Sequence, residues 1–192
     1  MQIKSVLMVG VGGQGIVLAG NVLAKAALSA GFDVKKSEIH GMAQRGGSVV
    51  SHVRIGDEVL SPSIPLGGAD FILSFEKMEY LRYLQYASVE SVLIVNSRRI
   101  LPPSVSLGKD SYPEETAESE KSRFTRTYEL DATGAAIQAG NAKTASIVLL
   151  GALSSFLEID VASWERAIAE SVPAKVTECN LIAFNSGKLL VV

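Results

Sequence analysis

The sequence predicts an α/β fold: a Rossmann-like open, mostly parallel sheet with an inserted β-hairpin and a helical C-terminal part. Three observations predict it. The apolar run Ser5–Val9 leads through a glycine-rich turn into the apolar stretch Ile16–Leu28, and strand, turn and helix in this order open a βαβ unit. Two further apolar runs of strand length follow after residue 69. Segments with helical periodicity close the chain.

The composition is that of one globular domain, which we expect to span residues 1–192. The chain has 192 residues, 47% hydrophobic and 20% charged, with a formal net charge of −2. Because no dense Lys/Arg cluster is present, nucleic acid is excluded as the main partner. The first apolar run is too short to span a bilayer and no signal-peptide pattern precedes it, so we expect a cytoplasmic protein without membrane contact.

The first elements follow from hydrophobic runs and their stop signals. Ile3–Val9 is predicted as a buried parallel strand and Ile16–Ala30 as the crossover helix, ended by Gly31. Asp33–Ser37 is predicted as the second parallel strand. Val49–Ile55 alternates between two faces and turns at Gly56-Asp57 towards Glu58–Leu60, which predicts a β-hairpin inserted into the α/β chain.

The βα alternation resumes after the hairpin. Asp70–Phe75 and Val92–Asn96 are predicted strands with a helical segment near Glu76–Tyr86 between them. Prolines, glycines and glutamates leave little to bury in residues 101–124, so we expect an irregular, exposed excursion there, with Glu114–Glu120 as a solvated loop. The remaining prediction is a last strand and four helices, over Thr125–Leu130, Thr133–Ala139, Thr144–Phe156, Val161–Ser171 and Ala174–Gly187.

The turn Gly10-Val11-Gly12-Gly13-Gln14-Gly15 is the first candidate site. In a G-x-G-x-x-G turn the first glycine permits a tight bend, the second lets a ligand approach the backbone, and the third lets the helix pack closely. The helix N-terminus adds unpaired N–H groups and a positive dipole end. An anion site near residue 12 is one interpretation, and a turn used only for packing is the other.

The segment Ser37–Ser48 is the second candidate site. It follows the second predicted strand, and loops at the carboxyl ends of neighbouring strands meet over one crevice. We therefore expect it near the glycine-rich turn. Its candidate binding residues are Glu38, His40, Gln44, Arg45 and Gly46.

Each of these side chains has two interpretations. Arg45 suits a phosphate or a carboxylate, or pairs with Glu38. Glu38 binds the ribose of a dinucleotide, or orders Arg45. His40 contacts a phosphate or transfers a proton, or only hydrogen-bonds within its loop, and Gln44 contacts a ligand or a subunit. Asn141 helps to bind an anion together with Lys143, or caps a helix.

Metal and redox centres are not expected in this chain. Cys179 is the single cysteine, so the chain alone forms no disulfide and no cysteine-ligated cluster. The two histidines, His40 and His52, have no metal-ligand spacing. We assign no metal ligand and no catalytic residue.

Several segments together resemble one family. The sequence is similar to the gamma-type subunits of the 2-oxoacid:ferredoxin oxidoreductases, and most to the indolepyruvate branch. One departure is Ser146, where the family often has Asn. The segments that carry the resemblance are 9–15, 37–49, Gly140-Asn141, 148–153 and 180–184.

The resemblance implies oxidative decarboxylation of an aryl 2-oxo acid such as indolepyruvate, with coenzyme A as acyl acceptor and ferredoxin as electron acceptor. It also implies a larger partner subunit that carries thiamine diphosphate and [4Fe–4S] clusters. This chain would complete the assembly and line a shared coenzyme A or substrate site. The alternative is a stand-alone NAD(P)- or nucleotide-binding Rossmann protein that uses the glycine-rich turn and Glu38.

Overall fold

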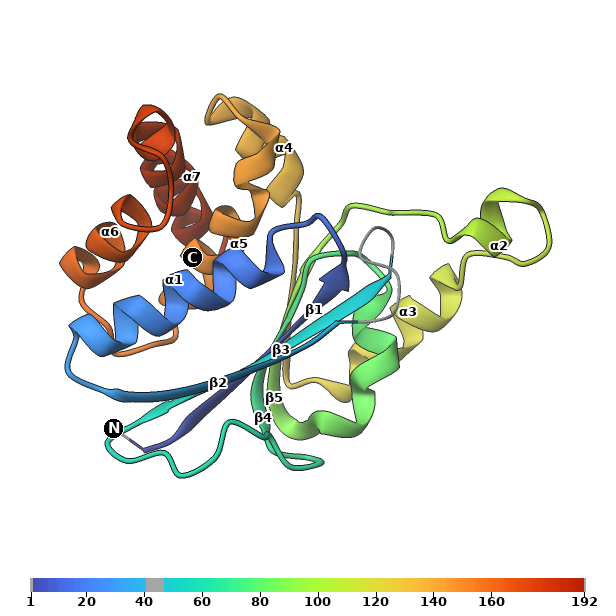
Figure 1. Ribbon diagram of the computed structural model, residues 1–192. Coiled ribbons are helices and arrows are strands. Elements are labelled where there is room, and N and C mark those ends of the chain that lie inside the picture. The colour runs from blue at the N-terminus through green and yellow to red at the C-terminus, as the bar shows by residue number, and fades with distance from the viewer. Residues whose placement is uncertain (1, 41–46, 192) are drawn as a thin grey trace.

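A six-stranded sheet forms the centre of the computed structural model, which describes residues 2–40 and 47–191 (Figure 1). The strand order is β2-β3-β1-β4-β5-β6. β1, β4, β5 and β6 run parallel, and β3 is antiparallel to both of its neighbours. The mostly parallel α/β sheet is therefore confirmed. The strands are β1 (Lys4–Val11), β2 (Asp33–His40), β3 (Ser48–Gly56), β4 (Ala69–Ser74), β5 (Ala87–Asn96) and β6 (Arg126–Leu130).

Two predictions about the sheet need correction. β2 runs in the same direction as β1, as predicted, but it is not the neighbour of β1, because β3 lies between them, antiparallel to both, and β2 forms the sheet edge. A parallel neighbour needs a crossover of a dozen or more residues, and the chain returns from β2 to β3 without one. The predicted hairpin between Val49–Ile55 and Glu58–Leu60 is also absent, because β1 and β2 already occupy both edges of β3.

Five helices cover one face of the sheet (Figure 1). Four of them, within residues 132–189, confirm the helical C-terminal part. α5 and α7 pack so closely that a Cβ atom on Gly151 would lie 2.0 Å from the Phe184 carbonyl oxygen. α1, with 14 residues, is the longest, and the described helices fall short of what a bilayer crossing needs. The five are α1 (Ile16–Ser29), α4 (Ala132–Gln138), α5 (Ala145–Ser154), α6 (Val161–Ala169) and α7 (Thr177–Leu189).

The opposite face has a smaller apolar core under the 3-10 helix η1 (Glu79–Tyr86) and α3 (Glu114–Glu120). The helix predicted near Glu76–Tyr86 is therefore tighter than expected, and its backbone departs from helical geometry at Tyr83. Tyr80 is fully buried in this core. The Tyr80 hydroxyl donates a hydrogen bond to the Ala117 carbonyl oxygen of α3.

Residues 101–124 are more ordered than their composition predicts. They contain α2 (Pro103–Ser106), α3 and the 3-10 turn η2 (Lys121–Arg123), and Ala117 is fully buried. The expected solvated loop Glu114–Glu120 is wrong, because this run forms α3 and its glutamates surround the amine of Lys77. The positive charge of Lys77, distant in sequence, thus helps to order the acidic segment Glu114–Glu120, which has few apolar residues of its own.

Candidate functional site

A cavity of about 550 Å³ lies at the carboxyl edge of the sheet, where open α/β sheets bind their ligands. A second cavity, of about 570 Å³, lies at the opposite edge of the sheet. Because it is not at the carboxyl edge, we do not assign it as the site. The first cavity is lined by the glycine-rich turn, the ends of β4 and β5, and the start of α5. Its lining residues are Gly12, Gly13, Gln14, Gly15, Phe75, Asn96, Arg98, Ile100, Ala142, Lys143, Ala145, Ser146 and Leu149.

The turn between β1 and α1 exposes backbone to this cavity. Gly13 and Gly15 have positive φ angles of 98° and 81°, which residues other than glycine rarely adopt. Neither N–H group of these two glycines has a hydrogen-bond partner in residues 2–40 and 47–191. Gly15 precedes the first turn of α1, where no side chain caps the helix. The turn therefore presents donors and a positive dipole end to the cavity.

Gln14 holds this turn in place. Its Oε1 accepts from the Val11 N–H and its Nε2 donates to the Phe75 carbonyl oxygen, each at 2.7 Å. These bonds join the turn to the end of β4. Gln14 lines the cavity, but its amide is already engaged by the backbone.

Ser146, on the first turn of α5, packs against Gly15 at the wall of the cavity. A Cβ atom on Gly15 would lie 2.8 Å from the Ser146 Oγ, so the third glycine of the turn packs against α5. The Ser146 side chain is 1% exposed, and its hydroxyl has no partner among the described residues. Because buried hydroxyl groups almost always make hydrogen bonds, the Ser146 hydroxyl is a candidate hydrogen-bond donor to a ligand.

The described lining of the cavity is electropositive. Arg98 and Lys143 line it, and no aspartate or glutamate of residues 2–40 and 47–191 does. The guanidinium of Arg98 and the amine of Lys143 make no hydrogen bond or ion pair with any described residue. Helix N-termini, two cations and a free hydroxyl together favour an anion of phosphate type.

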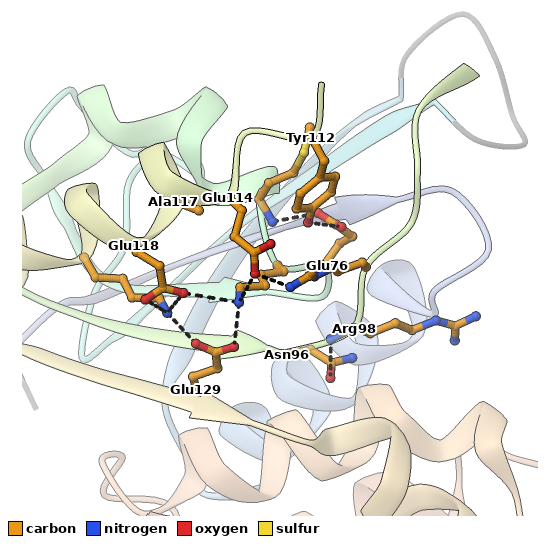
Figure 2. A network of polar contacts seen from close by, with 12 residues as sticks. Glu76, Asn96, Arg98, Tyr112, Glu114, Ala117, Glu118 and Glu129 are labelled. Atoms are coloured by element: carbon orange, nitrogen blue, oxygen red, sulfur yellow. Dashed lines mark hydrogen bonds and ion pairs between the residues drawn. The ribbon is translucent and has the colours of Figure 1, made fainter. Parts of the chain in front are cut away.

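Two buried charged residues, Glu76 and Lys77, make hydrogen bonds with the backbone of Arg98 and Ile100, which line the cavity. The Lys77 N–H donates to the Arg98 carbonyl oxygen at 2.9 Å, and a Glu76 oxygen accepts from the Ile100 N–H at 2.9 Å. The Asn96 Oδ1 accepts from the Arg98 N–H at 3.4 Å. Figure 2 shows the Arg98 side chain extending away from this network, so only its backbone is restrained.

The side chain of Lys77 is 10% exposed and lies 3.2–3.4 Å from Glu114, Glu118 and Glu129 (Figure 2). Burial disfavours its charge, but the hydrogen bonds to Glu118 and Glu114 outweigh burial and raise the pKa of Lys77. Burial, reinforced by the bond to Glu76, raises the pKa of the Tyr112 hydroxyl. Lys77 is thus a charged structural link and Tyr112 a neutral donor.

Several predicted site residues lie outside the cavity lining. Gly10 is in β1, where a Cβ atom would lie within 3 Å of Gln14, Phe75 and Ile16, so it serves close packing. Asn141 caps η3 (Ala142–Thr144), because its Oδ1 accepts from the Lys143 N–H at 3.0 Å.

The segment after β2 is only partly described. Glu38 lies two strands away from β1, and its carboxylate pairs with Lys36 at 2.6 Å. The side chain of His40 and residues Gln44, Arg45 and Gly46 lie outside the described part, so the proposed pair of Glu38 and Arg45 stays a prediction. The Gly47 carbonyl oxygen accepts from the Gly12 N–H at 2.9 Å. The end of this segment therefore lies beside the glycine-rich turn, as expected.

Arg98, Asn96 and Ser146 were missed as site residues. The carboxyl-edge rule that selected Ser37–Ser48 also applies to the predicted strand that ends at Asn96, and would have pointed to Arg98. Ser146 was noted only as a departure from the family pattern, and no spacing rule assigned it to the site. His52 is structural, since its Nδ1 accepts from the buried Ile64 N–H and its ring contacts Tyr86 edge-on.

The dinucleotide interpretation finds no support. In a dinucleotide fold the acidic residue ends the strand next to β1, and here β3 separates β1 from β2.

Known proteins resemble this chain over nearly its whole length. It is 41% identical to the indolepyruvate oxidoreductase subunit IorB of Pyrococcus horikoshii, over 97% of this chain and 95% of the relative. Its fold matches the gamma subunit of a keto/oxoacid ferredoxin oxidoreductase from Geobacter sulfurreducens, with a TM-score of 0.73, 25% identity and 98% of both chains covered.

A third likeness is to a longer chain. The whole of this chain matches 31% of a chain of the 2-oxoglutarate:ferredoxin oxidoreductase from Magnetococcus marinus, with a TM-score of 0.77 and 21% identity. That enzyme was solved with 2-oxoglutarate, coenzyme A and succinyl-CoA bound. Residues 5–189 match the family described as pyruvate ferredoxin/flavodoxin oxidoreductase. The chain therefore belongs to the pyruvate ferredoxin/flavodoxin oxidoreductase family.

Proposed function

We propose that this chain is a subunit of a cytoplasmic 2-oxoacid:ferredoxin oxidoreductase that acts on an aryl 2-oxo acid such as indolepyruvate. The indolepyruvate oxidoreductase subunit at 41% identity supports this substrate class. A larger partner subunit carries thiamine diphosphate and the [4Fe–4S] clusters, since a single cysteine cannot ligate a cluster. The complex releases carbon dioxide, passes electrons to ferredoxin and transfers the acyl group to coenzyme A.

The cavity at the carboxyl edge holds phosphate groups of coenzyme A. One observation carries this assignment: the buried Ser146 hydroxyl, which has no partner among the described residues, lies between Gly15 and the start of α5, and the charged residues in the described lining of the cavity are Arg98 and Lys143. The Arg98 guanidinium pairs with a phosphate and the Ser146 hydroxyl donates to one. The apolar side chains of Phe75, Ile100 and Leu149 suit the uncharged part of the cofactor.

This chain binds and orients coenzyme A and supplies no catalytic residue. Gly12, Gly13 and Gly15 present backbone to the ligand, while Gln14 fixes the turn. Gln44, Arg45 and Gly46 remain candidate ligands on the sequence alone, next to the position that Gly47 marks.

Steady-state kinetics of the assembled complex test the site. We expect Arg98→Gln to raise the KM for coenzyme A about tenfold or more, because a hydrogen bond to a charged group contributes about 1.5–3 kcal/mol. Ser146→Ala raises this KM to a smaller extent, and the KM for the 2-oxo acid stays unchanged in both variants.

The matched control is Arg126→Gln. Arg126 is also an exposed arginine and lines the cavity at the opposite edge, and its loss should leave the KM for coenzyme A unchanged. An unchanged KM in both site variants, or an equal rise in the control, would refute a coenzyme A site here.

A further inference from the structure

Glu79 is a buried carboxylate at the start of η1, on the face of the sheet opposite α1. Its side chain is 7% exposed, and a carboxylate is costly to bury unless it has hydrogen-bond partners. Its Oε2 accepts from the Ser48 hydroxyl at 2.8 Å, and its Oε1 accepts from the Arg82 Nε at 3.2 Å. The Arg82 side chain is 54% exposed. Arg82 therefore reaches the carboxylate from the solvent side, whereas Ser48 reaches it from the sheet.

Ser48 is the first residue of β3, and it joins Glu79 to the glycine-rich turn. Its hydroxyl donates to Glu79, so the Tyr83 hydroxyl, 3.1 Å away, is the donor to the Ser48 oxygen. The preceding residue, Gly47, accepts from the Gly12 N–H at 2.9 Å through its carbonyl oxygen. Gly12 lines the cavity at the carboxyl edge. A path of two hydrogen bonds and one peptide bond thus connects the buried carboxylate to the cavity wall.

This path restrains the end of the ladder between β1 and β3. The ladder ends where Val11 lies opposite Ser48, and the ends of such elements open most easily. Gly12, the next residue, has no side chain that could hold it, and glycine loses more conformational freedom on ordering than other residues do. On the other side Gln14 ties the turn to β4. Glu79 therefore restrains the turn from β3, as Gln14 restrains it from β4.

We propose that Glu79 is a positioning residue for coenzyme A: through Ser48 it holds the glycine-rich turn in the conformation that presents its backbone to the phosphate groups. Neither Glu79 nor Ser48 lines the cavity, so both act through Gly47 and Gly12. A turn that is ordered before binding loses less entropy when the ligand binds. This inference rests on the proposed function, since it requires coenzyme A to bind at the turn.

Isothermal titration calorimetry of coenzyme A into the assembled complex tests this role. We expect Ser48→Ala and Glu79→Ala each to raise the dissociation constant about fivefold or more, because each removes a hydrogen bond to a buried carboxylate. Ser48→Thr keeps the hydroxyl and should restore wild-type affinity. In steady-state kinetics the KM for coenzyme A rises in both alanine variants. The KM for the 2-oxo acid and the kcat at saturating coenzyme A stay at the wild-type values, because only binding is weakened.

The double variant Ser48→Ala/Glu79→Ala separates this link from a general structural loss. If both residues act through one bond, the double variant binds coenzyme A no more weakly than the weaker of the single variants, whereas independent effects would multiply. Arg82→Gln is the matched control. It removes the partner of the other Glu79 oxygen and leaves the Ser48 bond in place, so its affinity should equal that of the wild type. Circular dichroism melting curves verify that all variants fold.

Three results would each overturn the positioning role: wild-type affinity of Ser48→Ala and Glu79→Ala, multiplied losses in the double variant, or an equal loss in Arg82→Gln. Arg98→Gln distinguishes this failure from that of the proposed function. Weaker binding by Arg98→Gln alone would refute the role of Glu79 and leave the coenzyme A site intact. Wild-type affinity of Arg98→Gln and Ser146→Ala, or no binding by the wild-type complex, would refute the coenzyme A site and this inference with it.

Discussion

Lys77→Met is expected to destabilise the protein and to change how its stability depends on pH. Methionine keeps the apolar stem of the buried lysine and removes only its charge. Three glutamates, Glu114, Glu118 and Glu129, then face one another without the cation that lies 3.2–3.4 Å from them. The substitution therefore tests the contribution of the Lys77 charge to the ion-pair network shown in Figure 2.

The magnitude follows from the exposure of the pairs. The lysine is mostly buried, but the glutamate side chains are 30–51% exposed. Each ion pair therefore contributes a free energy of unfolding near the value for surface pairs, about 0.2–1 kcal/mol, and not the larger value for buried pairs. The three pairs together give a loss of about 2 kcal/mol. For a chain of this size that lowers the melting temperature by about 4–8 °C.

The pH dependence has two limbs. The raised pKa of Lys77 gives stability that is present below pH 10.5 and is lost as the pH rises through the folded pKa. The pKa of Glu118 is lowered by hydrogen bonds from Lys121 and Lys77, so its stabilisation is present above pH 4.5 and is lost as the pH falls through that lowered value. Without Lys77 the loss in acid should be smaller.

Thermal melting at pH 7 measures the loss of stability, and urea denaturation at pH 7 and pH 4 measures how that stability changes in acid. Lys35→Met is the control, because Lys35 pairs with a single aspartate on the surface of the edge strand, and it should leave the melting temperature nearly unchanged. Equal stability of Lys77→Met and wild type, or parallel pH profiles, would refute the structural role of this network.

Two further predictions concern the glycine-rich turn and a buried histidine. Gly13→Ala and Gly15→Ala both place alanine at a positive φ, which costs about 1–2 kcal/mol. Only the alanine of Gly15→Ala also contacts the Ser146 hydroxyl, so this variant should be the less stable of the two in urea denaturation. Equal losses of stability would contradict the close packing of Gly15 against α5. Burial lowers the pKa of His52 below 6.5, so the stability of the wild type should fall as the pH drops below 6.5. Urea titrations at pH 7.5 and 5.5 should show a weaker pH dependence for His52→Gln. Identical pH dependence of the two proteins would argue against a buried neutral imidazole.

Local pattern predicted most elements correctly. The strand before the glycine-rich turn, the helix after it and the late helices depend on runs of neighbouring residues, and the structure places them within a few residues of the expected bounds. The carboxyl-edge rule also predicted that the segment after β2 returns to the turn, as the bond between Gly12 and Gly47 confirms.

Pairings between distant residues could not be predicted in the same way. The register that places β3 between β2 and β1 depends on which strand edges are free. The order in residues 101–124 depends on Lys77 and Glu76, whose partners lie 24–52 residues further along the chain. No local pattern carries that information.

The sequence by itself determined the α/β class, the position of the glycine-rich turn between strand and helix, and the resemblance to the oxidoreductase family, because these depend on short-range spacing and on residue identity. Only the tertiary structure decided which side chains share the cavity. It added Arg98 and Ser146, and it left Gly10, Glu38 and Asn141 outside the lining. The physical reason is that a binding site is a set of residues brought together by packing, and packing is settled by contacts between distant segments.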